Sequence, residues 1–458
     1  MRKLNMKTPQ LLPYPKHLKL SEGYCLDLDN VENIINSKIA PEGYELTISP
    51  EKIVISSSDS TGRFYARATL SQLIHQYGNC LPCLKITDSP AFSWRGLHLD
   101  VSRHFFSTAY IKTLLKAMAA YKLNRFHWHL TDDQGWRIQI DKYPLLTDIG
   151  AWRRNEQGDT YGGFYTKAEI KEIIDFAAQL HIEIIPEIEM PGHARAAITS
   201  YPQFGCNAKK TQITTDWGVF DQVFCLGKEE TLIFLKDILT EVCELFPSRW
   251  LHTGGDECPT KSWEKCPHCM KKAKEVALPS VTDLQKWFTT EIAEFLQTKG
   301  KAMIGWDEIL GAKLPADNIV MVWRGDGIDA IKMALARKHQ MVLTPNLFYY
   351  FDWKQTSDEA EFGSFGVTTL SKTYSYQPLA ALKNEADQNL ILGIQGNIWT
   401  ERITNPDQVS YMAFPRALAI AETGWSKNKS NPAEFLARAK AQTAYLKCLS
   451  INPCQKSE

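Results

Sequence analysis

After residue 92 the chain alternates between short apolar runs and longer amphipathic stretches, and this alternation constrains the fold most strongly. The apolar runs have strand length and lie at residues 95–101, 125–130, 183–188, 250–253, 302–305, 319–322, 341–343 and 391–396. Strands that alternate with helices form parallel βαβ units, and eight units in roughly 340 residues predict a (β/α)8 TIM barrel. An open doubly wound sheet is the alternative. It usually carries a glycine-rich loop after its first strand, whereas this chain has Asp100-Val-Ser-Arg103-His104 there.

The amphipathic stretches carry helix signals. Hydrophobic residues at helical spacing, preceded by Ser107-Thr108, predict one helix through Ile111, Leu114, Leu115 and Met118. The pairs Thr166 with Glu169 and Thr282 with Gln285 have the spacing of capping boxes, so a helix is predicted to begin at each.

The segment before the barrel has a different pattern. Residues 44–48 and 52–57 alternate between apolar and polar side chains around a Ser-Pro-Glu turn, which predicts a β-hairpin, and a helical pattern follows at residues 66–74. The breaker cluster at residues 87–90 predicts a linker. We therefore expect a small α+β domain at 1–90, the (β/α)8 barrel at 91–430 and a helical tail at 431–458.

Composition narrows the range of partners. Lys+Arg and Asp+Glu both number 52, so no net field favours nucleic acid or an anionic membrane. No apolar run reaches 18 residues, the length needed to cross a bilayer. The first 25 residues contain no apolar region of a secretory signal, and the 11 cysteines are not spaced as a disulfide framework. Localisation and oligomeric state stay open.

Polar and aromatic side chains gather directly after the predicted strands, where the active site of a TIM barrel lies. These positions are Asp100, Arg103, Asp132, Asp133, Glu189, His193, Asp256, Glu257, Trp306, Asp307, Trp323, Arg324, Tyr350, Asp352, Trp399 and Glu401. Carboxylates bind hydroxyl groups, indoles stack on the C–H faces of pyranose rings, and a carboxylic acid can protonate a glycosidic oxygen. The combination predicts a sugar site.

Several motifs resemble those of family 20 glycoside hydrolases, the β-N-acetylhexosaminidases. They are SWRGLHLDVSRHF, NRFHWHLTDDQGWRI, IPEIEMPGH, LHTGGDE, IGWDEI, VWRG and GIQGNIWTE, in this order from about residue 92 to Trp425. The N-terminal unit is also similar to the small α+β domain of that family. The resemblance implies a carbohydrate substrate with a terminal β-linked GlcNAc or GalNAc, and leaves open which of the two is preferred.

The resemblance also implies roles for the polar residues. Glu257 becomes the general acid/base, and Asp256 the residue that orients and polarises the substrate's 2-acetamido group. Asp132 and His193 form a polar chain that tunes Glu257, although strand ends alone do not separate Asp132 from Asp133. Glu257 must be protonated for the first step, so burial or nearby carboxylates are expected to raise its pKa.

The remaining implied roles concern substrate binding. Tyr350 donates a hydrogen bond to the acetamido oxygen. The aromatic box around the acetamido methyl and the sugar face consists of Trp306, Trp323 and Trp399. The hydroxyls O3, O4 and O6 are held by Arg103, Asp352 and Glu401. A pocket that grips all three edges of one sugar predicts exo cleavage.

The adjacent pair Asp256-Glu257 supports one mechanism on physical grounds. A retaining glycosidase with a protein nucleophile places two carboxylates about 5–5.5 Å apart across the scissile bond, and neighbours at one strand end diverge. The acetamido oxygen of the substrate can replace the missing nucleophile through an oxazolinium intermediate. Configuration is then retained, and no cofactor or metal is expected in the chemistry.

Other interpretations fit the residues less well. His127 and His129 could begin a zinc site, but the fifth and sixth strand ends offer tryptophans rather than further ligands. A tetrahedral zinc knot could form from Cys258, Cys266, His268 and Cys269, with free thiols or a redox pair as alternatives. A sugar-binding lectin is disfavoured by the presence of Glu257, and the D-x-x-D-x-D-x-E run of the other substrate-assisted barrel family does not occur.

Overall fold

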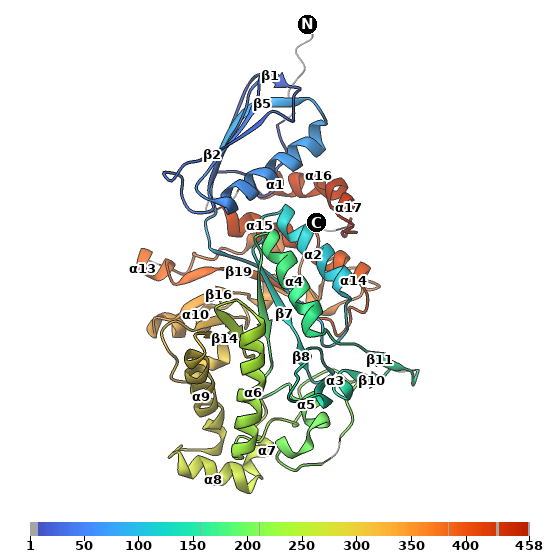
Figure 1. Cartoon of the computed structure of the whole chain (residues 1–458), viewed down its shortest axis with the longest axis vertical. Helices are drawn as coiled ribbons and strands as arrows, with labels where there is room; N and C mark the ends of the chain where they lie inside the picture. Colours follow the sequence, from blue (N-terminus) through green and yellow to red (C-terminus); the bar gives the residue numbers. More distant parts are fainter. Residues whose placement is uncertain (1–7, 156, 210, 383, 427–429, 457–458) are drawn as a thin grey trace.

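The computed structural model describes residues 8–155, 157–209, 211–382, 384–426 and 430–456. Its centre is a closed barrel of eight strands in the order β12-β13-β14-β15-β16-β19-β6-β7, and every neighbouring pair is parallel. The strands are β6 (Trp94–Asp100), β7 (Arg125–His129), β12 (Glu183–Glu187), β13 (Trp250–His252), β14 (Ala302–Trp306), β15 (Ile319–Val322), β16 (Gln340–Leu343) and β19 (Ile391–Ile398). The predicted barrel is therefore confirmed (Figure 1).

Amphipathic helices cover the barrel and bury their apolar faces against it. The main ones are α2 (Thr108–Ala120), α4 (Lys167–Gln179), α6 (Glu229–Leu245), α9 (Leu284–Thr298), α10 (Ile328–Ala336), α14 (Pro406–Ala413) and α15 (Arg416–Trp425). Ser107 caps α2, and Thr166 with Glu169 forms the predicted capping box of α4. The second predicted box is wrong. Ser280 caps a short 3-10 turn, η2 (Val281–Asp283), before α9, and Gln285 instead donates a hydrogen bond to the Gly255 carbonyl (2.6 Å).

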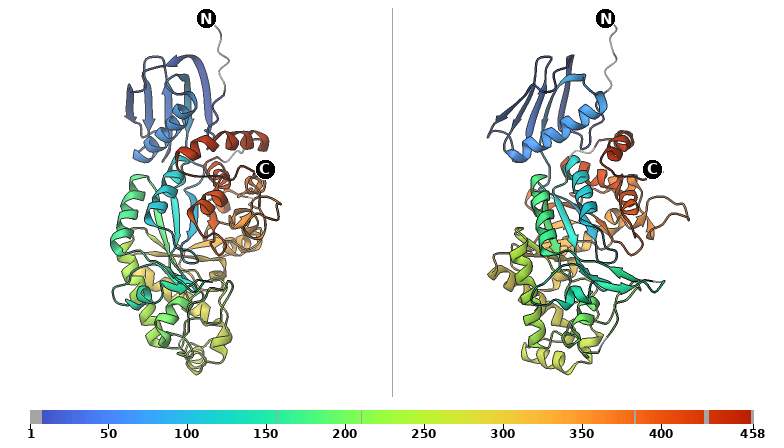
Figure 2. Two further views of the ribbon diagram at one scale, coloured as in Figure 1. Left: turned by 90° about the vertical axis from the view of Figure 1, so that its right-hand side faces the viewer. Right: turned by 45° about the vertical axis from the view of Figure 1, so that its right-hand side comes forward.

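The N-terminal domain is a five-stranded sheet with one long helix. Its strands run in the order β1-β5-β3-β4-β2 and the helix is α1 (Ser60–Tyr77). Their bounds are β1 (His17–Cys25), β2 (Val31–Ile35), β3 (Tyr44–Ile48), β4 (Ile53–Ser57) and β5 (Leu81–Asp88). β3 and β4 form the predicted antiparallel hairpin. Figure 2 shows α1 between this sheet and the rest of the molecule.

The two domains meet through buried polar groups at the N-terminal ends of β6 and β7. Arg95, fully buried, donates hydrogen bonds to the Glu42 carboxylate (2.7 Å) and the Tyr65 hydroxyl (2.9 Å). Lys122 is paired with the buried Asp88 (3.3 Å). Because this network occupies the base of the barrel, the opposite, C-terminal ends of the strands remain free for a site.

The C-terminal residues form two short helices, α16 (Pro432–Ala441) and α17 (Thr443–Cys448). Gln442 between them accepts a hydrogen bond from the Tyr121 hydroxyl (3.2 Å), and Tyr445 packs on the rings of Tyr121 and His75. The tail therefore contacts both α2 of the barrel and α1 of the N-terminal domain. Among the described residues, no helix combines the length and hydropathy needed to cross a membrane.

Candidate active site

A cavity of about 290 Å³ opens at the C-terminal ends of the barrel strands. It is lined by Arg103, Asp132, His193, Asp256, Glu257, Trp323, Asn346, Tyr350, Asp352, Trp353, Phe365, Trp399 and Glu401. Every residue to which the sequence resemblance gave a role lines it, except Trp306. These side chains come from loops after at least six strands, so the closed barrel brings them together.

The loop after β13 carries the acidic pair in a strained conformation. Glu257 has a φ of 46° and His193, on the loop after β12, has a φ of 45°, a region that non-glycine residues seldom occupy. Gly254, with φ 64°, has no room for a Cβ, because the Glu189 carboxylate would lie 1.8 Å from it. Such strain concentrates at active sites, and here it turns the Glu257 carboxylate toward the cavity.

His193 connects the acidic pair to a second pair of carboxylates. Its Nδ1 lies 3.1 Å from both Asp132 and Asp133, and its Nε2 lies 3.7 Å from Glu257 and 3.8 Å from Asp256. Burial alone lowers the pKa of His193, but Asp132, Asp133 and Glu257 together outweigh it, so the pKa lies well above the usual range. The imidazole is therefore a cation, and both candidate partners, Asp132 and Asp133, contact it.

The predicted rise in the pKa of Glu257 is wrong for the ligand-free structure. The hydrogen bond from His193 lowers the pKa of Glu257, and burial, which acts in the opposite direction, is the weaker effect. The carboxylate is only partly covered, since its side chain is 43% exposed. A substrate that covers Glu257 removes water from it and shifts its pKa upward.

Asp256 has the opposite environment. Burial raises its pKa to about 6; His193 acts against this rise, and Glu187 and Glu257 add to it. Its Oδ1 atom has no hydrogen-bond partner within the described part of the chain, although it is buried. An unpaired buried carboxylate oxygen costs stability, which is expected where a ligand completes the hydrogen bonding.

Aromatic rings form one wall of the cavity. Trp323 and Tyr350 stack with their ring centroids 6.0 Å apart and an interplanar angle of 11°, and Trp399 lies 6.1 Å from Tyr350. Trp306 lies below this wall, almost fully buried, and its indole N–H donates to Glu187 (2.9 Å). It supports Trp399, whose ring is 5.8 Å away, rather than lining the cavity.

The opposite wall is polar. Arg103 forms ion pairs with Asp132 (2.9 Å) and Asp100 (3.3 Å), and one of its nitrogens lies 3.9 Å from Glu401. Asp352 is buried and its Oδ1 has no partner among the residues that the structure describes. Burial and the nearby Glu401 raise the pKa of Asp352 well above its usual range.

Sequence reasoning missed several participants. Asn346, Trp353 and Phe365 line the cavity, but they lie beyond the strand ends, in the short elements α11 (Asn346–Tyr349), β17 (Trp353–Lys354) and β18 (Ser364–Val367) after β16. Glu308 accepts a hydrogen bond from the Trp323 indole (3.0 Å), and burial raises its pKa to about 8. The run Trp306-Asp-Glu308 carried the signal for Glu308, since it follows the fifth strand directly.

The histidines considered for zinc surround a carboxylate instead. Glu187 lies 2.9 Å from His127, 2.5 Å from His129 and 2.8 Å from His252, and all four side chains are fully buried. Burial raises the pKa of Glu187, but these histidines outweigh it and the pKa lies well below its usual range. These contacts pair the three imidazoles with Glu187 and hold the floor of the cavity.

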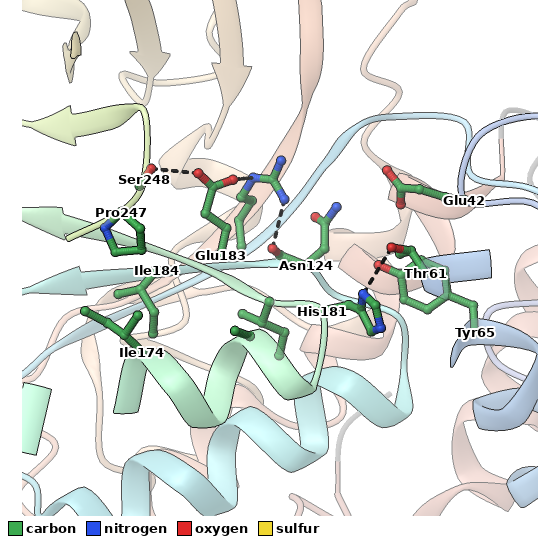
Figure 3. A pocket seen from close by; sticks show the side chains of 13 residues that line it. Glu42, Thr61, Tyr65, Asn124, Ile174, His181, Glu183, Ile184, Pro247 and Ser248 are labelled. Atoms are coloured by element: carbon green, nitrogen blue, oxygen red, sulfur yellow. Dashed lines mark hydrogen bonds and ion pairs between the residues drawn. The ribbon is translucent and has the colours of Figure 1, made fainter. Parts of the chain in front are cut away.

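A second cavity lies at the other end of the barrel (Figure 3). Its polar residues pair with one another: Glu183 accepts a hydrogen bond from Ser248 (2.7 Å) and contacts Arg125 (3.2 Å), while Thr61 bonds His181 (3.0 Å). It borders the N-terminal ends of the strands, whereas the active sites of TIM barrels lie at the C-terminal ends. We therefore assign it no catalytic role.

The cysteines do not group as expected. His268 is exposed and Cys258 lies in the Glu257 loop, and neither joins Cys266 and Cys269. The sulfur atoms of Cys206 and Cys225 meet that pair instead. The predicted zinc set is therefore wrong in two members, because the separate loop that supplies Cys206 and Cys225 folds back onto the other two.

Comparisons with known proteins agree with this geometry. The model of "Glycosyl hydrolase family 20, catalytic domain" matches residues 92–428, and that of "Glycosyl hydrolase family 20, domain 2" matches residues 14–89. A Porphyromonas gingivalis β-hexosaminidase is 39% identical over 411 residues, which cover 87% of this chain and 52% of that protein. The chain thus spans about half the length of this relative.

Two further proteins match more of their own length. An Akkermansia muciniphila β-hexosaminidase is 34% identical over 423 residues, covering 91% of this chain and 86% of that protein. The crystal structure of a GH20 exo β-N-acetylglucosaminidase from Vibrio harveyi, in complex with N-acetylglucosamine, matches with a TM-score of 0.90 at 32% identity. That match covers 98% of this chain and 78% of the other.

Proposed function

The chain belongs to glycosyl hydrolase family 20, and on this premise we propose that it is an exo-acting, retaining β-N-acetylhexosaminidase. It removes a terminal, non-reducing β-linked GlcNAc or GalNAc from an oligosaccharide or glycan. One observation carries the proposal: the buried Oδ1 atoms of Asp256 and Asp352 have no partner among the described residues, and both side chains line the same aromatic-walled cavity. They supply acceptors for the N–H and hydroxyl groups of one sugar.

The mechanism assigned to this cavity uses the substrate as its own nucleophile. Asp256 accepts the acetamido N–H and stabilises the positive charge that develops there, and Tyr350 holds the acetamido oxygen in line with C1. The C1–oxygen bond to the leaving group breaks as the acetamido oxygen attacks C1. Glu257 donates its proton to the leaving oxygen, then takes one from the water that opens the oxazolinium ring.

The walls of the cavity fix the sugar for this reaction. The stacked rings of Trp323 and Tyr350, with Trp399, enclose the acetamido methyl and the apolar face. Arg103, Asp352 and Glu401 bind O3, O4 and O6. No edge of the sugar is left for a further residue on the non-reducing side, which supports exo cleavage.

The deciding experiment compares two aryl β-glycosides that differ only in the 2-substituent, acetamido against hydroxyl. Substrate assistance predicts turnover of the acetamido compound alone, strong inhibition by a thiazoline analogue of the intermediate, and a product that retains configuration. Glu257→Gln should lower kcat by about 10²–10⁴-fold with a poor leaving group. A carboxylate labelled covalently by a fluorosugar would contradict the mechanism, and binding without turnover would favour a lectin.

A time course on a chitin tetramer tests the exo assignment separately. Release of monosaccharide and trimer first is the expected result. Disaccharide as the dominant first product would show that the cavity leaves one edge of the bound sugar open.

A further inference from the structure

Four cysteine sulfurs converge at the end of the molecule far from the N-terminal domain. The Sγ atoms of Cys225 and Cys266 are 3.6 Å apart, those of Cys225 and Cys269 are 3.6 Å apart, and those of Cys206 and Cys269 are 3.8 Å apart. All four sulfurs lie within 4.8 Å of one another, and only Cys206 is partly exposed. Nothing in the proposed reaction uses them.

The cysteines come from two loops and one helix. Cys206 follows the 3-10 turn η1 (Pro202–Phe204), and a bridge between Gly205 and Phe224 brings Cys225 alongside it. Cys266 is the N-terminal cap of α8 (Pro267–Glu275) and Cys269 lies in its first turn. Figure 1 shows α8 at the extremity opposite the N-terminal sheet.

The spacing of the sulfurs fits a metal rather than disulfides. A disulfide requires about 2.0 Å between sulfurs, well below the observed separations. Four sulfurs arranged tetrahedrally at 2.3 Å from a zinc ion lie about 3.8 Å apart. We propose that Cys206, Cys225, Cys266 and Cys269 bind one Zn²⁺ ion in a closed, structural site.

The donor set and its surroundings select this ion. Four thiolates are soft ligands that suit zinc and exclude magnesium and calcium, and a complete protein set leaves no open position for catalysis. The Gly227 N–H donates a hydrogen bond to the Cys225 sulfur, as supporting groups around thiolate ligands do. The positive end of the α8 dipole also favours thiolates at Cys266 and Cys269.

Gly227 shows how tightly the two ligand-bearing segments are packed. A Cβ at this position would lie 2.1 Å from the carbonyl carbon of His268 and 2.3 Å from the Cys269 nitrogen. The turn after Cys225 therefore packs directly on the backbone of the Cys266–Cys269 turn, and the four sulfurs are held at ligand distance before any ion binds.

The site has a consequence for the catalytic loops. Cys266 follows Glu257 by nine residues. Between them, the Trp263 indole donates to the Phe224 carbonyl (2.9 Å), and the Phe224 N–H donates to the Pro191 carbonyl (3.0 Å), two residues before His193. A zinc ion at the cysteines fixes the far end of this chain of contacts, so it stabilises the loops of Glu257 and His193 without touching substrate.

The test measures metal and sulfur chemistry on the whole chain. Protein purified without added metal should contain one zinc per chain, and cobalt substituted for zinc should give the visible absorption of tetrahedral thiolate-bound cobalt. The zinc content of the double variant Cys266→Ser/Cys269→Ser should be at least tenfold lower than that of the unmodified protein. The matched control is Cys243→Ser, which removes a half-buried cysteine outside the cluster and should keep the full zinc content.

Other outcomes overturn the proposal. Iron in place of zinc, a disulfide between two of these four cysteines found by peptide mapping, or metal-free protein that takes up no zinc on addition would each refute it. These three measurements use the unmodified chain, so they decide the question even if the double variant fails to fold. They are also independent of glycosidase activity, so failure here leaves the proposed function standing.

Discussion

The proton shared by Asp256 and Glu257 determines the pH dependence expected of this protein. Burial raises the pKa of Asp256 to about 6, while His193 holds the pKa of Glu257 below its ordinary 4.5. The proposed reaction needs the reverse arrangement, with Asp256 ionised and Glu257 protonated. The active form is therefore the less populated of the two singly protonated forms. Its concentration is a fixed fraction of the singly protonated pair, so it changes with pH as that pair does.

We expect kcat/KM to be bell-shaped in pH. Above about pH 6 both carboxyls are ionised and no acid remains, and below the pKa of Glu257 both are protonated and Asp256 carries no charge. In Asp256→Asn the alkaline limb should move to lower pH, because only the low pKa of Glu257 remains. Initial rates with a fluorogenic substrate measure this, and a limb that stays in place would contradict the assignment.

Phe365 is the residue we expect to hold the leaving sugar. Its side chain is 90% exposed, its φ is 52°, and it lines the mouth of the cavity. An aromatic face there is worth about 0.5–1.5 kcal/mol, so Phe365→Ala should lower kcat/KM on a chitin oligosaccharide roughly two- to tenfold.

The Phe365 ring should contribute less to kcat/KM when the leaving group is small. Phe365→Ala is therefore expected to leave kcat/KM on the methyl glycoside close to that of the unmodified protein. Met333→Ala, a truncation of an exposed side chain on α10, is the control and should leave kcat/KM unchanged on both substrates. Equal losses on both substrates would place Phe365 outside the leaving-group side.

At the level of elements, the loop after β13 depends on a glycine. Gly254→Ala puts a methyl group where the Glu189 carboxylate lies, and misplacement of a reacting group by about 1 Å can cost 10²-fold in rate. We expect kcat to fall by about that factor. Gly300→Ala is the matched control, since Gly300 also has a positive φ (72°) but nothing within 4 Å of its missing Cβ. Similar losses in both would point to backbone strain alone.

The elements also show what the sequence could and could not predict. The barrel strands were predicted because apolar runs and helical spacing are local signals. The capping box at Thr282 and Gln285 failed because a nearer serine caps the turn and Gln285 reaches Gly255, which is a tertiary contact. The cysteine set failed for the same reason: Cys206 lies 60 residues before Cys266.

In the candidate site too, features set by local signals were predicted, and features set by tertiary contacts were not. Strand-end positions identified most of the cavity lining, since the barrel fixes where those ends lie. The position of Trp306 below the lining and the lowered pKa of Glu257 depend on how His193 and the tryptophans pack, which spacing along the chain does not determine.

On the scale of the whole molecule, the two domains are joined by a buried ion pair. Lys122 and Asp88 are at most 1% exposed as side chains, and the Lys122 ammonium also donates to the Tyr44 hydroxyl (2.9 Å). Removal of one buried partner leaves an uncompensated charge, which typically costs about 3–5 kcal/mol. Lys122→Met should therefore lower the free energy of unfolding by that amount.

Thermal unfolding followed by circular dichroism measures the effect. The control is Lys52→Met, which breaks the ion pair with Glu32. The side chains of Lys52 and Glu32 are 49% and 47% exposed. Exposed pairs contribute about 0–1 kcal/mol, so this variant should unfold near the temperature of the unmodified protein. If both variants behaved alike, the interface would owe its stability to apolar packing.

The acidic wall formed by Asp352 and Glu401 also sets when such a protein can act during glycan breakdown. Among the described residues that line this cavity, both cations are already balanced: Arg103 by Asp132 and Asp100, and His193 by Asp132 and Asp133. A sulfate ester at O4 or O6 of the terminal sugar would face two carboxyl groups with no free positive charge to receive it. On the proposed function, a terminal sugar with a sulfate ester at these positions should be a poor substrate until the ester is hydrolysed, so we expect sulfate-ester hydrolysis to precede this step.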